Sequence, residues 1–369
     1  MDVAHQIRIS EADLVIGAID EHATLVDFCA HGSIKQEHTF GKGFAETLLD
    51  LTADPFVGLL TGVVATTLVQ SSSTTTSIVV GLVAGGGLSL TTAIPIIMGA
   101  NIGTTITNTL VAVGHVANRV EFRRAFSAGV VHDFFNVGAV IVLFPLEMRF
   151  GFIARTAQWL EHGFADVGGV KLFNPLKAIV HPAIDLTDAL LGSVPYAPFV
   201  MAVVAAIFMF GSLGGLIATM RSLMLARIEV IIHKYLFRND VMGLLFGIAM
   251  TIMVQSSSIT TSLIIPLAGA GLVTLRQIFP YTLGANIGTT VTAMLAALVT
   301  QHEVAITVAF SHLVFNILGI AIFYPLKRLP IGLAEIVGRY ASQSKRHLVI
   351  FVSCYISLYF VPLIFIIFG

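Results

Sequence analysis

The chain has 369 residues, of which 56% are hydrophobic and only 11% are charged. A soluble protein cannot bury that much apolar surface in one core, so the composition predicts a multi-pass membrane protein. The formal net charge is -1, and Lys and Arg gather in a few connecting segments, which gives no indication of a nucleic-acid partner.

Residues 1–40 are polar, and their charged side chains lie too close together for a bilayer span. They lack a charged start followed by an apolar stretch, so we expect no cleavable signal peptide. We interpret this segment as a surface or interfacial helix at most. Membrane insertion then depends on the apolar segments that follow.

Residues 41–148 form the first of two predicted repeats. Between residues 56 and 118 there is no Asp, Glu, Lys or Arg. Because a membrane span needs about 20 residues, this stretch is long enough for about three crossings or their equivalent. A further apolar segment covers residues 125–146.

Residues 149–197 are a connector of mixed composition, and residues 198–330 form the second predicted repeat. Residues 331–369 are a C-terminal segment that ends in an apolar helix. Most apolar segments of this half are long enough to span a bilayer. They cover residues 199–220, 242–275, 277–302, 304–326 and 348–368.

The two repeats share two polar motifs at a constant spacing. Gln70-Ser71-Ser72-Ser73 returns as Gln255-Ser256-Ser257-Ser258, and Gly-Ala-Asn-Ile-Gly-Thr-Thr occurs at 99–105 and again at 284–290. Both motifs recur after 185 residues. The surrounding segments match at about half of their positions, which indicates an internal duplication.

Loop charge predicts how the repeats are oriented. Lys and Arg accumulate in short cytoplasmic loops, so Arg119, Arg123 and Arg124 place the loop at 114–124 inside. The equivalent loop at 300–303 has neither Lys nor Arg, which predicts the outer face. Equivalent loops on opposite faces mean that the repeats are inverted, an architecture associated with alternating-access transporters.

The duplicated motifs have chemistry suited to an anion bound together with a cation. At membrane depth, backbone that leaves helical geometry must be buried in protein or line a wet cavity. Helix N-termini and Ser or Thr hydroxyls can donate to an oxyanion, while carbonyl and hydroxyl oxygens suit sodium. Helix packing explains a single serine more simply, but the paired motifs favour binding.

Glycines flank Ala-Asn-Ile in both copies of the second motif, at Gly99, Gly103, Gly284 and Gly288. Such glycines allow either close helix contact or local unwinding. We favour unwinding, and we therefore expect a broken transmembrane helix in each repeat.

Several segments resemble the type II sodium-dependent phosphate cotransporters. They are residues 69–74, 94–104, 121–126 and 131–136 in the first repeat, and residues 254–258 and 283–290 in the second. The resemblance covers roughly 41–148 and 199–326. It implies an all-α membrane protein with two inverted-topology repeats, each with a re-entrant helical hairpin tipped by Gln-Ser-Ser-Ser. It also implies electrogenic import of inorganic phosphate with sodium ions by alternating access.

The resemblance further implies site residues. The phosphate-binding positions are Gln70, Ser71, Ser72, Ser73, Asn101, Ser256, Ser257, Ser258 and Asn286. The sodium-binding positions are Gln255, Ser256, Thr289, Thr292, Asp133, Asn136 and Thr104. Asp133 matches the aspartate of electrogenic members, and an acid within an apolar span is usually functional. The alternative is an interfacial Asp that caps its helix or pairs with Arg123 or Arg124.

The sequence departs from the family at three positions. His115, Asn118 and Ala285 stand where many relatives have Gln, Asp and Ser, so a third sodium site lacks a carboxylate and a hydroxyl. We interpret His115 as an interfacial residue and not as a proton-coupling group. The connector lacks the large cysteine-bearing external loop of animal members, which favours a bacterial plasma (inner) membrane protein.

Other functions stay open. A transporter of another oxyanion, sulfate or a dicarboxylate, is the closest alternative, and an ion channel is a more distant one. A membrane enzyme is disfavoured, because neither a Gly-x-Ser-x-Gly elbow nor a metal-ligand cluster accompanies His132 and Asp133. We expect no cofactor apart from coupling sodium ions. The expected partners are phosphate, sodium and lipid, and the oligomeric state is open.

Overall fold

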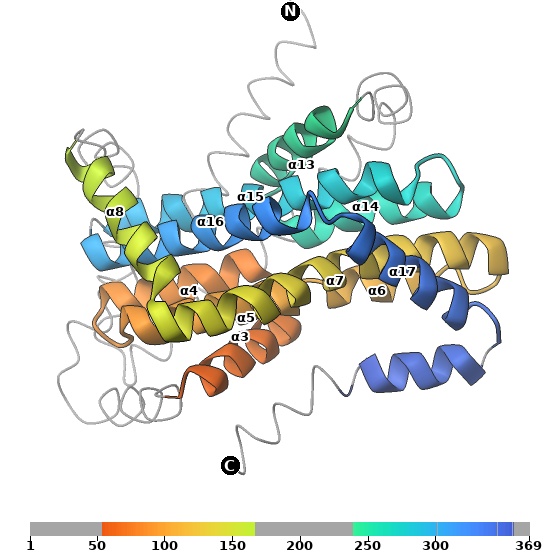
Figure 1. The fold of residues 1–369 in the computed structure, drawn as a ribbon, viewed down its shortest axis with the longest axis horizontal. Coiled ribbons are helices and arrows are strands. Elements are labelled where there is room, and N and C mark those ends of the chain that lie inside the picture. Colours follow the sequence, from red (N-terminus) through yellow and green to blue (C-terminus); the bar gives the residue numbers. More distant parts are fainter. Residues whose placement is uncertain (1–53, 167–238, 301, 345, 356, 358–369) are drawn as a thin grey trace, which may run out of the picture.

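The computed structural model describes residues 54–166, 239–300, 302–344, 346–355 and 357 (Figure 1). The expectations for segments 1–40 and 199–220, and for the end of the last apolar segment, fall outside these residues. Every regular element in the described part is a helix and none is a strand, which confirms the all-α prediction.

The helices are arranged as follows in chain order. The first half contains α3 (Pro55–Val69), α4 (Ser72–Ala84), α5 (Leu90–Gly103), α6 (Ile106–Val113), α7 (Arg119–Phe150) and α8 (Phe152–Asp166). The second half contains α13 (Asp240–Val254), α14 (Ser257–Gly269), α15 (Leu275–Thr300), α16 (Glu303–Phe323) and α17 (Arg328–Ala341). A last described helix covers Arg346–Tyr355.

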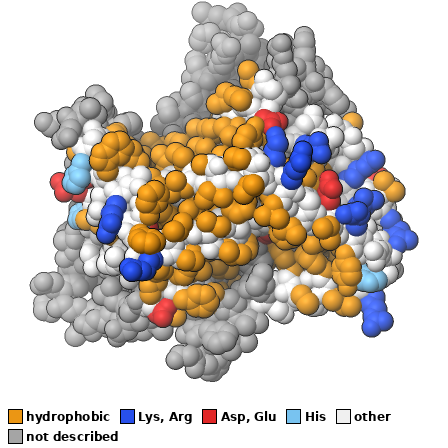
Figure 2. Space-filling view, viewed as in Figure 1, with side chains coloured by type: hydrophobic (Ala, Val, Ile, Leu, Met, Phe, Trp, Pro, Cys, Tyr) orange, Lys and Arg blue, Asp and Glu red, His pale blue; other side chains and the backbone are white. Residues whose placement is uncertain are grey.

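In the described part, 4 helical segments are long and apolar enough to cross a membrane. They are α7, α15, α16 and the segment Leu90–Val113, which contains α5 and α6. Figure 2 shows hydrophobic side chains over the middle of one face, with Lys and Arg mostly toward its right-hand end. This distribution suits a bilayer around the middle of the molecule.

Each Gln-Ser-Ser-Ser motif forms the turn of a helical hairpin, α3–α4 or α13–α14. Gln70 and Gln255 have left-handed backbone, with φ of 60° and 55°, and end the first helix. Ser71 and Ser256 start the second helix, because each hydroxyl accepts the backbone N–H three residues on, at 3.2 and 3.3 Å. A left-handed residue costs about 1–2 kcal/mol, and a serine cap of about 1 kcal/mol offsets much of that.

The second helices of the two hairpins leave their turns in opposite directions. In Figure 1 the loop between α4 and α5 lies at the left end, and the loop between α14 and α15 lies at the right end. Equivalent parts of the two predicted repeats therefore reach opposite ends of the molecule.

Close helix contact accounts for the glycines of the second motif. α5 packs on α3, and α15 packs on α13 in the same way. A Cβ at Gly99 would overlap the carbonyl oxygen of Leu59 in α3, and one at Gly284 would overlap that of Leu244 in α13. Only a residue without a side chain allows the two backbones to approach so closely.

The expected helix break is present in one repeat only. α5 and α6 are separate helices with Thr104 and Thr105 between them, but α15 is continuous. The prediction of a broken helix in the second repeat is therefore wrong, because α15 runs without interruption through Gly284 and Gly288, which pack on α13. At the break, Thr105 donates a hydrogen bond to Asp133. The repeat partner of Asp133 is Leu313, which offers no acceptor.

Helix α7 lies between the two halves and packs against α6, α14, α16 and α17. Phe135 meets Phe279 of α15 and Phe323 of α16 edge-on, with ring centroids 6.2 and 6.1 Å apart. These aromatic contacts hold the middle of α7 against α15 and α16 of the second half.

Gly284→Ala tests the packing role of the motif glycines. The added Cβ meets the backbone of α13, which cannot rotate away, so we expect a loss of about 1–3 kcal/mol of stability, the usual cost of overpacking. Thermal unfolding of the purified protein in detergent measures it. Gly332→Ala in α17 is the matched control, because a Cβ there meets nothing within 4 Å. An unchanged unfolding temperature in Gly284→Ala would contradict the packing role.

Candidate functional site

A polar strip interrupts the apolar middle of α7. His132, Asp133 and Asn136 are 0%, 6% and 0% exposed. Polar groups so deeply buried are costly unless they are hydrogen-bonded, and inside a membrane span they mark functional positions. Each of the three has partners on other helices.

Asparagines connect α7 to the second motif of both repeats. His132 Nε2 lies 2.7 Å from Asn286 Oδ1 in α15. Asn286 Nδ2 donates to Asn136 Oδ1 at 2.8 Å, and Asn136 Nδ2 donates to the carbonyl oxygen of Asn101 in α5 at 2.7 Å. The two motif asparagines are thus brought together through α7.

The partners of His132 fit a neutral ring. Asn286 presents its carbonyl oxygen to Nε2, and Asn108 of α6 presents Nδ2 to the other ring nitrogen at 3.4 Å. One acceptor and one donor match an imidazole with its proton on Nε2. A neutral ring also avoids an unpaired buried charge.

The histidine of the second repeat makes a similar contact with the motif asparagine of the first repeat. His312 is the repeat partner of His132, and its Nε2 lies 3.4 Å from Asn101 Oδ1. Each histidine therefore contacts the asparagine of the other repeat. The shorter distance at His132 shows that the two contacts are only approximately equivalent.

The glutamine of each turn connects its hairpin to a later helix of the same half, α6 or α15. Gln70 Oε1 accepts a hydrogen bond from Thr107 Oγ1 of α6 at 2.6 Å. Gln255 Oε1 accepts one from Thr292 Oγ1 of α15, also at 2.6 Å. Thr289 lies about one turn before Thr292 on the same side of α15, and its hydroxyl donates to the carbonyl oxygen of Ala285 at 3.1 Å.

The serines of the two motifs begin α4 and α14 and are buried. Ser258 Oγ donates to the carbonyl oxygen of Thr104 at 3.3 Å, which joins the second hairpin to the end of α5. Its counterpart, Ser73, has no hydrogen-bond partner among the described residues. Within the same residues, no hydrogen bond joins one Gln-Ser-Ser-Ser motif directly to the other.

Asp133 lies in the middle of α7 and accepts hydrogen bonds from Thr105 Oγ1 and from the hydroxyl of Tyr355 at 2.8 Å. The interfacial alternative is wrong in one respect, because a residue so far inside α7 does not cap the helix. Arg124 is more than two turns away along α7, about 14 Å at 1.5 Å per residue.

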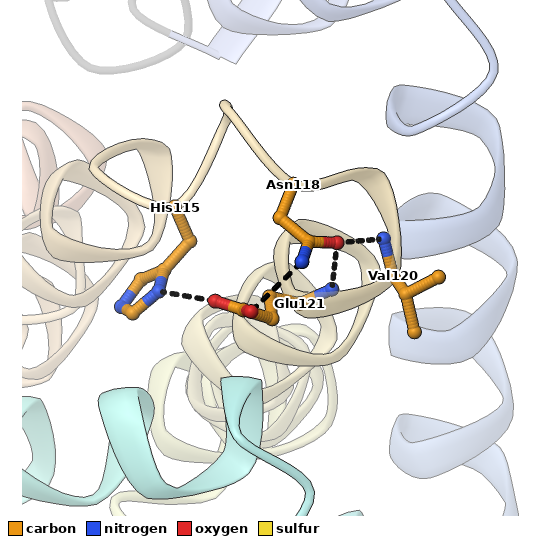
Figure 3. A network of polar contacts seen from close by, with 4 residues as sticks. All are labelled: His115, Asn118, Val120 and Glu121. Carbon is orange, nitrogen blue, oxygen red and sulfur yellow. Dashed lines mark hydrogen bonds and ion pairs between the residues drawn. The ribbon is translucent and has the colours of Figure 1, made fainter.

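Two of the three departures from the family lie in the loop between α6 and α7 (Figure 3). Asn118 caps α7 by accepting the backbone N–H groups of Val120 and Glu121 at 3.0 and 3.3 Å, and its Nδ2 donates to Glu121 Oε1 at 2.8 Å. His115 Nδ1 lies 4.0 Å from Glu121 Oε2. Both residues thus belong to a loop network. Ala285, the third departure, is buried in α15.

Asn108 is a central residue that the sequence interpretation did not single out. Its Oδ1 accepts hydrogen bonds from Thr261 and Ser262 of α14, at 2.9 and 3.0 Å. The signal was present, because the repeat partner of Asn108 is Ala293 in an otherwise similar segment. Among the described residues, no group of three His, Cys, Asp or Glu could hold a metal ion.

Comparison with known proteins identifies relatives. The Na+/Pi-cotransporter family matches residues 33–160 and 200–336, which is more than half of the chain. Sodium-dependent phosphate transport protein 2A of rabbit (Oryctolagus cuniculus) is 33% identical over 365 residues, covering 78% of this chain and 57% of the rabbit protein. Protein 2B of human (Homo sapiens) is 31% identical over 386 residues, covering 79% and 56%.

The chain thus spans little more than half the length of these relatives. No solved structure matches it. The four long apolar helices agree with a multi-pass membrane protein. The extent of the family match shows that the chain belongs to the Na+/Pi-cotransporter family.

Proposed function

We propose that this protein is a sodium-coupled secondary transporter that imports inorganic phosphate across a bacterial plasma (inner) membrane. The observation that carries the proposal is the pair of Gln-Ser-Ser-Ser turns with buried serines, in which each glutamine accepts a hydrogen bond from a threonine of a later helix of the same half, α6 or α15. Relatives of this chain are sodium-dependent phosphate transport proteins.

The transport domain consists of two inverted repeats, residues 41–148 and 198–330, with α3–α4 and α13–α14 as re-entrant hairpins. The first helix of each hairpin has 15 residues and the second has 13. At 1.5 Å per residue, 15 residues reach about 22 Å. This is less than the hydrocarbon core of about 30 Å, so each polar turn lies at membrane depth.

Phosphate binds between the N-termini of α4 and α14. Their first turns carry unused backbone N–H groups and positive dipole ends, both of which favour an oxyanion. The phosphate ligands come from the serine hydroxyls of the two motifs, from Gln70, and from the motif asparagines Asn101 and Asn286, which α7 brings together.

Sodium ions bind beside phosphate, at sites made of side-chain oxygens. Gln255, Ser256, Thr289 and Thr292 form one site, where hydroxyl and amide oxygens offer the hard ligands that a cation prefers. A second group, Asp133, Asn136 and Thr104, connects α7 with the end of α5. Transport proceeds by alternating access, with the hairpins moving relative to α7.

Phosphate uptake into proteoliposomes tests the function. Because sodium supplies the charge that phosphate needs in a neutral site, we expect accumulation above the external concentration with sodium outside, and none with choline or lithium. A channel cannot accumulate its ion in this way. Sulfate or a dicarboxylate, added in excess, should leave the uptake of radiolabelled phosphate unchanged. Inhibition by either one, or equal uptake in choline, would overturn the proposal.

Thr292→Val tests the sodium site of the second hairpin. The change keeps the shape of the side chain but removes the hydroxyl that contacts Gln255. The sodium concentration for half-maximal uptake should rise about 10-fold or more, as expected for damage to ion coordination. Thr156→Val is the matched control, because Thr156 is a partly buried residue of α8 whose hydroxyl bonds its own helix backbone. Equal sodium dependence in both variants would argue against the site.

Asp133→Gly tests electrogenic transport. Loss of one buried negative charge changes the net charge moved in each cycle, so the current for each phosphate taken up should fall toward zero while some uptake persists. Simultaneous measurement of current and radiolabelled uptake gives this ratio. A variant that keeps the full ratio would show that Asp133 has only a structural role.

A further inference from the structure

A separate cavity of about 520 Å³ lies near the start of α7, between α7, the α14–α15 loop and α17. Its polar lining consists of Arg123, Arg124, Ser127, Thr274 and Glu335. Eight residues separate Arg124 from His132, so the cavity is about 12 Å along α7 from the buried asparagine network. Loop charge predicts that this end is cytoplasmic.

The two arginines of the cavity are exposed residues. Neither guanidinium lies within 4.0 Å of a carboxylate in the described residues. Arg119, on the same helix, differs because it donates to the carbonyl oxygens of Ser342 and Gln343. Free guanidinium groups on the wall of a cavity are ready to bind an oxyanion, and they match its geometry.

The guanidinium of Arg124 lies against the α14–α15 loop at Gly271. Gly271 has φ of +79°, and a Cβ there would collide with the guanidinium of Arg124. The equivalent loop of the first hairpin has Gly86 with a similar φ of +74°, but a Cβ there would meet nothing within 4 Å. Both repeats thus have the same backbone turn, but only the turn at Gly271 has an arginine, Arg124, packed against it.

The remaining lining adds one favourable and one opposing charge. Thr274 and Leu275 place the N-terminus of α15, with its partial positive charge, at the wall. Glu335 of α17 supplies the opposing carboxylate. Two arginines and one glutamate leave the cavity with a net positive charge.

We propose that this cavity binds a phosphate group through Arg123 and Arg124, independently of sodium. Free inorganic phosphate and the headgroup of an anionic phospholipid present the same chemistry. The site lies apart from the transport network, so the proposal does not depend on the transport function.

The test measures binding to the purified full-length chain in sodium-free choline buffer. One arm uses radiolabelled inorganic phosphate with the protein in an uncharged detergent. The other arm uses nanodiscs of phosphatidylcholine with and without phosphatidylglycerol, followed by mass spectrometry of the lipid that stays bound. We expect binding in at least one arm, and the positive arm identifies the source of the phosphate group.

Arg123→Gln with Arg124→Gln should weaken that binding at least about tenfold, because bonds to a charged group are lost. Glu335→Gln should tighten it, since the opposing carboxylate is removed. Arg149→Gln, at the other end of α7, is the matched control and should bind like the parent. Thermal unfolding shows whether each variant is folded.

Four results would overturn the proposal. The first is that the parent protein binds in neither arm, and the second is that the double variant binds as tightly as the parent. The third is that Arg149→Gln weakens binding as much as the double variant does. The fourth is that Glu335→Gln binds as tightly as the parent or more weakly. This variant keeps both arginines, so its result is informative even if the double variant does not fold.

Discussion

The hydrogen bond between the glutamine of each hairpin turn and a threonine of the following helix is the contact on which this structure depends. A left-handed turn within a membrane protein leaves helix-end carbonyl groups unsatisfied. The side chain of Gln255 satisfies one of these carbonyl groups, because its Nε2 donates to the carbonyl oxygen of Ile252 at 2.7 Å. Its Oε1 accepts a hydrogen bond from Thr292 at 2.6 Å. The same side chain thus completes the helix end and fixes the hairpin against α15.

The two hairpins share this glutamine–threonine contact but differ in the hydrogen bonds of their other polar side chains. In the second hairpin, Thr261 and Ser262 donate to Asn108. Their counterparts in the first hairpin, Thr76 and Ser77, are buried without a hydrogen-bond partner among the described residues. The cause lies in the sequence, because the partner of Asn108 in the other repeat is Ala293. The first hairpin is therefore less firmly held by polar contacts, and burial of unpaired hydroxyls lowers its stability.

Periodic polar motifs could be read from the sequence more reliably than helix continuity. The repeated Gln-Ser-Ser-Ser motif predicted where polar groups gather, and the all-α class followed from composition. The glycines were misread in the second repeat, because glycine at one spacing permits both unwinding and close packing. A close backbone contact lies beside the glycine in both repeats, Leu59 at Gly99 and Leu244 at Gly284, so only the three-dimensional structure shows which helix is continuous. Likewise, the pairing of Asp133 with Tyr355 depends on a contact 222 residues apart, for which a single sequence carries no signal.

The distribution of charge gives a physical reason for coupling. The amides, hydroxyls and neutral imidazole of the buried network can orient phosphate but cannot balance its charge, and the carboxylate of Asp133 adds a further negative charge. An uncompensated anion at membrane depth is strongly disfavoured. On the proposed function, sodium must therefore arrive with phosphate. A fixed arginine in that network would bind phosphate without sodium and so uncouple the two. Arg123 and Arg124 stand instead at the end of α7, where fixed positive charge can hold a phosphate group without removing the need for sodium at the centre.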